Sequence, residues 1–132
     1  MKLPEAKAAA LKLLQDDERF LVTCHRRPDA DALGSALGFA VLLRTLGKQA
    51  TVWIPETLAA NLRFIPGEVV TELPEDARFD STWVMDTAST ALLPPGLPEQ
   101  DVRGPLVIVD HHAAHDDVGD LVVRDIDACA TG

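Results

Sequence analysis

The feature that most constrains the fold is an apolar segment that runs directly into polar residues of the kind that bind metals. Residues 20–24 (Phe-Leu-Val-Thr-Cys) have β character, and His25, Asp29 and Asp31 follow within the next seven positions. A sequence of small, helix-type residues begins immediately afterwards. This order predicts a strand, a short loop at its carboxyl end and a helix behind it, the repeating unit of a parallel α/β sheet.

Helix-type and strand-type segments alternate along the rest of the chain. We predict helices over residues 4–15, 32–46 and 57–65, and strands over residues 20–24, 50–54, 69–70, 81–85, 106–109 and 121–123. Residues 92–104 are rich in proline and glycine and predict an irregular connection. We therefore expect one α/β domain, with a mostly parallel sheet and helices on both faces in a doubly wound arrangement.

The two long helical segments differ in their apolar pattern. In the first, Leu11 and Leu14 are predicted to face the sheet. The second, residues 32–46, has almost no polar face and is predicted to be buried. We interpret Gly34 and Gly38 as flattening the face of that helix that touches the sheet.

Three predicted strands end in residues that can bind metals. Asp86 follows residues 81–85, and Asp110, His111 and His112 lie at the end of the strand over 106–109. Because the carboxyl ends of parallel strands lie on one edge of a sheet, we expect these groups to meet those of the first loop. Crowded carboxylates and imidazoles need a balancing cation, and their combination suits a first-row divalent metal.

Each of these residues has a simpler interpretation when it is considered alone. An aspartate at a strand end often caps the following helix, and Asp31 is placed for that role. A lone histidine such as His25 is more often a packed or surface residue. The combination favours a metal site. His115 lies in an aspartate-rich turn and is expected to be solvated.

Charge and composition narrow the choice of substrate and location. The net charge is −9, which disfavours non-specific binding of long duplex nucleic acid. A phosphorylated substrate would need a bound divalent cation to reverse the local charge. There is no apolar segment of membrane-spanning length and no signal peptide, so we expect a cytoplasmic protein with no membrane partner and with Cys24 and Cys129 reduced.

The first and last of these motifs resemble those of a known family. His25-x-x-Pro28-Asp29-x-Asp31-Ala-Leu-Gly34-Ser35, together with Asp110-His111-His112, is similar to the motifs of the DHH phosphoesterases. The first motif resembles the branch of bifunctional oligoribonucleases and pAp phosphatases (nano-RNases). Other branches are cyclic-dinucleotide phosphodiesterases, manganese pyrophosphatases and single-strand-DNA exonucleases. The similarity runs from about residue 20 to residue 132.

The resemblance implies a site with two manganese ions, with Mg²⁺ or Co²⁺ as the alternatives. It implies that one ion is held by His25, Asp29 and Asp86. The other is held by Asp31, Asp86 and His111, with Asp86 shared. Asp110 would support a metal-binding histidine or act as a weaker ligand, and His112 would contact the scissile phosphate. The implied reaction is hydrolysis of short oligonucleotides or phosphorylated nucleotides such as pAp by two-metal chemistry.

The chain also departs from the family pattern. A fourth motif with one more metal-binding aspartate is missing, because Asp125 and Asp127 come too early in the sequence, and the C-terminal substrate-binding domain is missing as well. We therefore expect residues 1–132 to be an N-terminal DHH domain that is truncated at its C-terminus and weakly active or inactive alone. A homodimer is left open.

Three alternatives remain open at this stage. The chain could act on cyclic dinucleotides or pyrophosphate, as other branches of the family do. It could be an incomplete DHH domain that serves as a binding or assembly module. It could also be a phospho-acceptor receiver domain, but that class needs a lysine after a late strand, and the last lysine here is Lys48.

Overall fold

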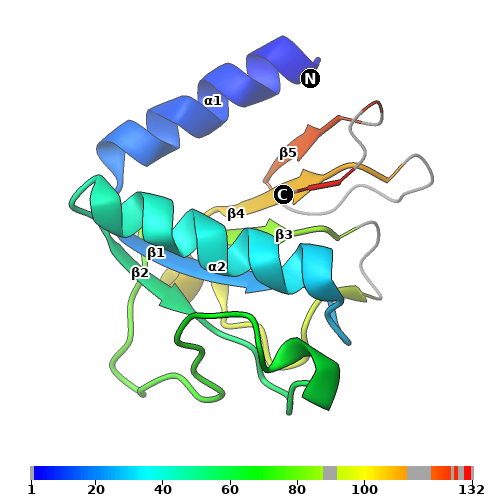
Figure 1. The fold of residues 1–132 in the computed structure, drawn as a ribbon. Helices are drawn as coiled ribbons and strands as arrows, with labels where there is room; N and C mark the ends of the chain where they lie inside the picture. Colours follow the sequence, from blue (N-terminus) through cyan, green and yellow to red (C-terminus); the bar gives the residue numbers. More distant parts are fainter. Residues whose placement is uncertain (1, 88–91, 113–119, 126, 128–129, 132) are drawn as a thin grey trace.

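A parallel sheet of five strands forms the centre of the computed structural model, which describes residues 2–87, 92–112, 120–125, 127 and 130–131. Its strands lie in the order β2-β1-β3-β4-β5 (Figure 1). Their bounds are β1 Arg19–Cys24, β2 Gln49–Val52, β3 Ser81–Met85, β4 Leu106–Asp110 and β5 Leu121–Arg124. Every neighbouring pair is parallel. The predicted α/β class is confirmed.

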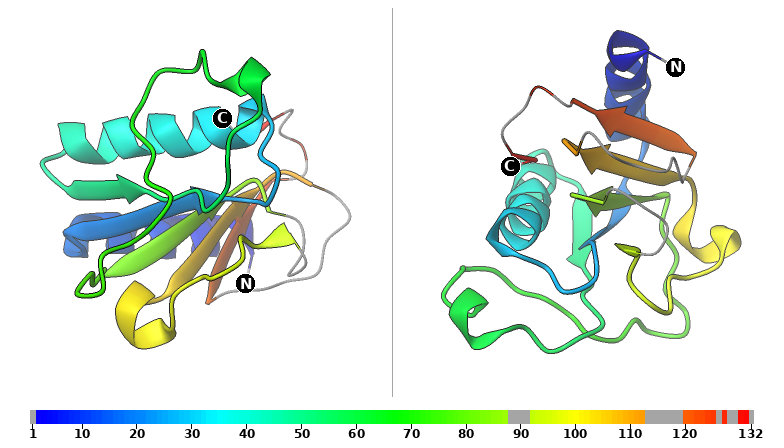
Figure 2. Two further views of the ribbon diagram at one scale, coloured as in Figure 1. Left: turned by 90° about the horizontal axis from the view of Figure 1, so that it is seen from below. Right: turned by 90° about the vertical axis from the view of Figure 1, so that its right-hand side faces the viewer.

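Helices lie on both faces of the sheet, but unequally. Helices α1 (Leu3–Asp16) and α2 (Ala30–Thr45) share one apolar core with that face of the sheet. The opposite face carries the single-turn helix α3 (Gln100–Arg103) and the irregular chain before it, as the two views of Figure 2 show. On that side Leu93 and Leu97 pack against a small core of Val84, Leu106 and Ile108.

Most of the predicted elements are present, and the differences lie in short segments. Within residues 57–65 only a 3-10 turn, η1 (Ala60–Leu62), is formed. The strand predicted at residues 69–70 is a single bridge between Trp53 and Val70. Helix α3 forms inside the segment predicted to be irregular, and it ends at Gly104 with a φ of 67°. A Cβ at Gly104 would lie 2.3 Å from the carbonyl oxygen of Asp80, so only glycine fits there.

The predicted helix faces are partly wrong. In α1 the small residues Ala6 and Ala10 are buried, whereas Leu11 is 58% exposed. In α2, which was predicted to be buried all round, Val41 and Leu42 are 60% and 49% exposed. In α2 the sheet covers only one stripe of the helix, so apolar side chains on its other faces stay exposed. In α1 the small side chains of Ala6 and Ala10 are the ones that pack closely against the core.

An apolar cavity of about 570 Å³ separates α1 from α2. Gly34 and Gly38 line this cavity, and a Cβ at either position would meet no atom within 4 Å. The interpretation that these glycines flatten the face of α2 on the sheet is therefore wrong, because they face the cavity instead. Leu11, Leu42 and the last described residue, Thr131, line the same cavity.

Asp80, which directly precedes β3, is hydrogen-bonded to the start of β1. Its carboxylate accepts hydrogen bonds from the backbone N–H groups of Glu18 and Arg19, each at 2.9 Å. The bond from Arg19, followed by that from Glu18, lowers the pKa of the Asp80 carboxyl below its ordinary value of 3.8. The ionised form is therefore the one that stabilises this junction.

We expect Asp80→Ala to lower the free energy of unfolding by about 1 kcal/mol near neutral pH, because two backbone donors lose their acceptor. A lowered pKa means that the contribution is present above the ordinary carboxyl pKa and is lost as the pH falls through the lowered value. Urea titrations at pH 7 and at about pH 3 measure the difference. Asp80→Asn, which keeps a carbonyl acceptor, should lose less, and an equal loss at both pH values would contradict this account.

Two smaller observations concern the predicted location and thiols. None of the helices in the described ranges is long and apolar enough to cross a membrane. Cys24 is a buried free thiol, and burial raises its pKa to about 12, so it is neutral and unreactive at physiological pH. Cys129 lies outside the described residues.

Candidate metal centre

The predicted site lies where the strand order changes direction. From β1 the chain continues to β2 on one side, while β3 pairs with β1 on the other side. Sheets of this order bind ligands at the carboxyl ends of the two strands that flank this switch point. His25 follows β1 directly and Asp86 follows β3 directly. Topology alone therefore places these two residues beside each other.

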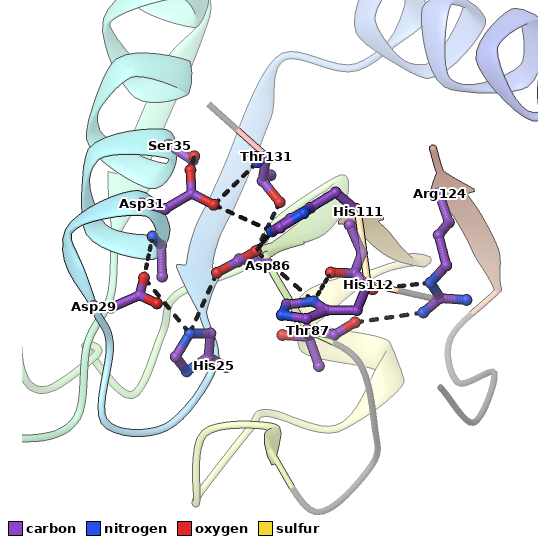
Figure 3. A network of polar contacts seen from close by, with 12 residues as sticks. His25, Asp29, Asp31, Ser35, Asp86, Thr87, His111, His112, Arg124 and Thr131 are labelled. Carbon is purple, nitrogen blue, oxygen red and sulfur yellow. Dashed lines mark hydrogen bonds and ion pairs between the residues drawn. The ribbon is translucent and has the colours of Figure 1, made fainter. Parts of the chain in front are cut away.

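Asp86 is the central residue of the site (Figure 3). Its side chain is 3% exposed, and its two carboxylate oxygens face different histidines. Oδ2 lies 3.5 Å from Nε2 of His25, and Oδ1 lies 3.1 Å from Nε2 of His111. Its backbone has a φ of 64°, held by a hydrogen bond from its N–H to the Val109 carbonyl. A non-glycine residue in this region stores strain, which is a common property of functional sites.

His25, Asp29 and Asp86 form the first possible metal-binding group. Nε2 of His25 lies 3.9 Å from Oδ1 of Asp29. Nδ1 of His25 is 2.6 Å from the Arg26 carbonyl oxygen, which can only accept, so we assign the ring proton to Nδ1. That tautomer leaves the lone pair of Nε2 facing the two carboxylates.

Asp29 also caps α2, because its Oδ1 accepts a hydrogen bond from the Ala32 N–H at 2.8 Å. The capping role considered for Asp31 therefore belongs to Asp29. The difference arises because α2 begins at Ala30, two residues earlier than predicted. Asp31 lies in the first helical turn instead, and its Oδ1 accepts a hydrogen bond from the Ser35 hydroxyl.

Asp86, His111 and His112 form the second possible group, and Asp31 lies beside it. Oδ2 of Asp31 is 3.5 Å from Nε2 of His111. Nδ1 of His112 is 3.9 Å from Oδ1 of Asp86. The rings of His111 and His112 lie against each other, with centroids 4.6 Å apart. The two groups therefore meet at the Asp86 carboxylate.

Among the described contacts, the Asp110 side chain is hydrogen-bonded to His112 of the motif and not to His111. Its Oδ1 accepts a hydrogen bond from Nδ1 of His112. Its Oδ2 accepts a hydrogen bond from Nε of Arg124 at 2.9 Å. The Asp110 side chain is fully buried. Asp110 thus positions His112, the residue that the resemblance assigns to the substrate phosphate.

The electrostatics at the centre reflect close pairing of acid and base. The hydrogen bond with Asp86 raises the pKa of His25, against the opposing effect of burial. Burial by itself would raise the pKa of Asp86, but the hydrogen bonds from His25 and Thr131 outweigh it and lower the pKa. The two side chains therefore stabilise each other's charged forms, an environment that favours a cation between them, while the neutral His25 ring offers the Nε2 lone pair to such a cation.

The donor set fits a divalent cation. Carboxylate oxygens and imidazole nitrogens converge within 4.8 Å in each of the two groups. A buried carboxylate shared by the two groups would be costly without a balancing cation. Mixed nitrogen and oxygen donors suit a first-row divalent metal, whereas an all-oxygen set would suit Mg²⁺ or Ca²⁺ better.

Two residues of the site were missed by the sequence analysis. Arg124 comes from β5, and Thr131 lies near the end of the chain. The Thr131 hydroxyl donates to Oδ1 of Asp86 at 2.8 Å, and its N–H donates to Oδ2 of Asp31 at 3.0 Å. No local pattern could reveal contacts across 45 and 100 residues. His115 lies outside the described residues.

The chain is similar to a curated protein in sequence and to a solved structure in fold. The chain is 34% identical over 115 residues to the bifunctional oligoribonuclease and PAP phosphatase NrnA of Thermus thermophilus, covering 83% of this chain and 33% of that protein. The chain thus spans about a third of the length of this curated relative. The crystal structure of an exopolyphosphatase-related protein from Bacteroides fragilis has a similar fold, with a TM-score of 0.78 and 18% identity, over 97% of this chain and 41% of that one.

The family match covers most of the chain. Residues 19–132 match the DHH family, N-terminal domain, a range that begins at β1 and contains every predicted site residue. Those residues are His25, Asp29, Asp31, Asp86, Asp110, His111 and His112. On this match, the chain belongs to the DHH family and carries its N-terminal domain.

Proposed function

We propose that this protein is a metal-dependent phosphoesterase that hydrolyses short oligonucleotides or phosphorylated nucleotides such as pAp. The observation that carries the proposal is the Asp86 carboxylate, whose two oxygens face His25 on one side and His111 on the other. Such a shared carboxylate suits a centre of two metal ions. The T. thermophilus relative, named for oligoribonuclease and PAP phosphatase activity, supports this substrate class.

In this proposal the seven predicted site residues divide into two ligand sets and a pair in which His112 faces the substrate and Asp110 supports His112. His25, Asp29 and Asp86 would hold one Mn²⁺ ion, and Asp31, Asp86 and His111 would hold the second. When bound, such ions lower the pKa of water and offset the negative charge of a phosphate group. Thr131 and Ser35 then act as supports, since each donates a hydrogen bond to one of the carboxylates and limits its rotation.

His112 is the residue proposed to meet the scissile phosphate. Its side chain is 41% exposed, the most open of the three described histidines of the site. Since Nδ1 of His112 is bound to Asp110, Nε2 is the ring atom left for the substrate. The buried Asp110 carboxylate holds that ring in one orientation. Binding and orientation of the phosphate are therefore the tasks assigned to this pair.

The acidic character of the chain favours small substrates. The net charge of −9 opposes the approach of a long polyanion, because phosphate contacts dominate that affinity. A short oligonucleotide or a mononucleotide can be held mainly by the metals and His112. We therefore propose that longer nucleic acids are poor substrates.

A substrate panel tests the proposal. The chain is incubated with Mn²⁺ and, in parallel, with excess chelator, using pAp, a short oligoribonucleotide, a cyclic dinucleotide and pyrophosphate. We expect slow Mn²⁺-dependent release of phosphate from pAp or of mononucleotides from the oligoribonucleotide, at a low rate because the chain spans about a third of its curated relative. Exclusive cleavage of the cyclic dinucleotide or of pyrophosphate would overturn the substrate assignment. Binding of Mn²⁺ with no hydrolysis of any substrate would favour the binding or assembly module instead.

A further inference from the structure

A buried arginine on β5 is connected to the substrate-facing histidine through one carboxylate. Arg124 is paired with Asp110 in the register of β4 and β5, and its side chain is 7% exposed. Its Nε donates to Oδ2 of Asp110 at 2.9 Å, and its Nη2 lies 3.5 Å from the Thr87 carbonyl oxygen. Figure 3 shows the guanidinium on the side of the site away from His25 and Asp29.

The Asp110 carboxylate has different partners at its two oxygens. Oδ2 accepts from Arg124, and Oδ1 accepts from Nδ1 of His112. With both oxygens engaged, the carboxylate cannot rotate about its terminal bond without breaking a hydrogen bond. Because the Asp110 side chain is fully buried, water cannot replace a lost partner. The orientation of the His112 ring therefore depends on the residue that holds Oδ2.

We propose that Arg124 is a positioning residue that acts through Asp110 to fix the ring of His112. The effect on rate rests on the proposed phosphoesterase function, whereas the effect on the ring does not. Arg124 donates to Asp110 and lies beside the Thr87 carbonyl, and neither of these groups is assigned to a metal. Loss of these two contacts is therefore expected to disturb the histidine more than the metal ligands.

The experiment uses Arg124→Met, with Arg44→Met as the matched control. Arg44 also donates to a backbone carbonyl, that of Ala50, but it lies on the exposed face of α2. NMR spectra of histidine selectively labelled with ¹⁵N, recorded on the metal-free protein, report each imidazole. In the unsubstituted protein and in Arg44→Met we expect one His112 environment with the proton on Nδ1. In Arg124→Met we expect the His112 signals to split or broaden while those of His25 are unchanged.

Steady-state kinetics with Mn²⁺ and pAp provide the second measurement. Misplacing a group that contacts the substrate by about 1 Å can cost about 100-fold in rate, so we expect kcat to fall about 10- to 100-fold. KM should change by less than about threefold, because the metal ions would still hold the phosphate and only its orientation by His112 is lost. In an Asp110→Asn background, Arg124→Met should cause almost no further loss, since the connecting carboxylate is already gone.

Two results would overturn the inference. One is an unchanged His112 spectrum in folded Arg124→Met. The other is an equal loss of kcat from Arg124→Met with and without Asp110→Asn. If Arg124→Met does not fold, Arg124→Lys keeps the buried charge without the guanidinium geometry, and it must still disturb His112. If the unsubstituted protein hydrolyses nothing, the proposed function fails, but the NMR result still decides whether Arg124 positions His112.

Discussion

Asp86→Asn is expected to abolish Mn²⁺-dependent hydrolysis and to weaken Mn²⁺ binding by more than about 100-fold. Substitution of a residue that only supports a metal ligand already lowers metal affinity or activity by about 10- to 100-fold. Asp86 would be a ligand of both ions, so its loss affects both together. Asparagine has the same shape as aspartate and tolerates the φ of 64° found here. Alanine would add backbone strain to the loss of a ligand.

Isothermal titration with Mn²⁺ measures the effect, and thermal unfolding of the metal-free protein shows that the variant is folded. Asp101→Asn is the matched control, because Asp101 is an exposed aspartate on α3, outside the metal centre. It should bind Mn²⁺ like the unsubstituted chain. If Asp86→Asn binds two ions with unchanged affinity, the shared-carboxylate proposal is wrong and the site must be assigned to other residues.

Mn²⁺ is expected to raise the thermal unfolding midpoint of the chain by roughly 10 °C when its concentration is about 100 times the dissociation constant. A ligand at that excess that binds only the folded state stabilises it by about 2.7 kcal/mol. For a domain of this length each kcal/mol corresponds to about 3–5 °C. The physical reason is that the paired carboxylates and imidazoles come together only on folding, so the unfolded chain offers no comparable site.

Differential scanning calorimetry with Mn²⁺, with Ca²⁺ and with chelator measures this shift. We expect a smaller shift with Ca²⁺, which prefers sites made only of oxygen ligands. His25→Gln and His111→Gln should each reduce the Mn²⁺ shift, because each removes a nitrogen donor from a different ligand set. An equal shift in unsubstituted protein and in the Asp86→Asn variant would mean that the stabilising ion binds elsewhere.

The apolar runs of the chain were enough to predict the strands that carry the site. Residues 81–85 were predicted without error, and β1 and β4 differ from prediction by one residue at one end. These segments are short, apolar runs bounded by polar residues, and burial in a parallel sheet demands that pattern. The prediction failed for the segments over residues 57–65 and 69–70, where no continuous apolar stripe selects one structure.

The sequence by itself determined which residues could bind metal and that they share one edge of the sheet, because a parallel sheet has all its strand carboxyl ends on one side. Only the tertiary structure decided that Asp86 faces both His25 and His111, that Asp29 caps α2, and that Arg124 and Thr131 join the site. These contacts depend on the order of the strands and on side-chain directions. Both arise from packing between segments far apart in the chain, which local sequence patterns do not record.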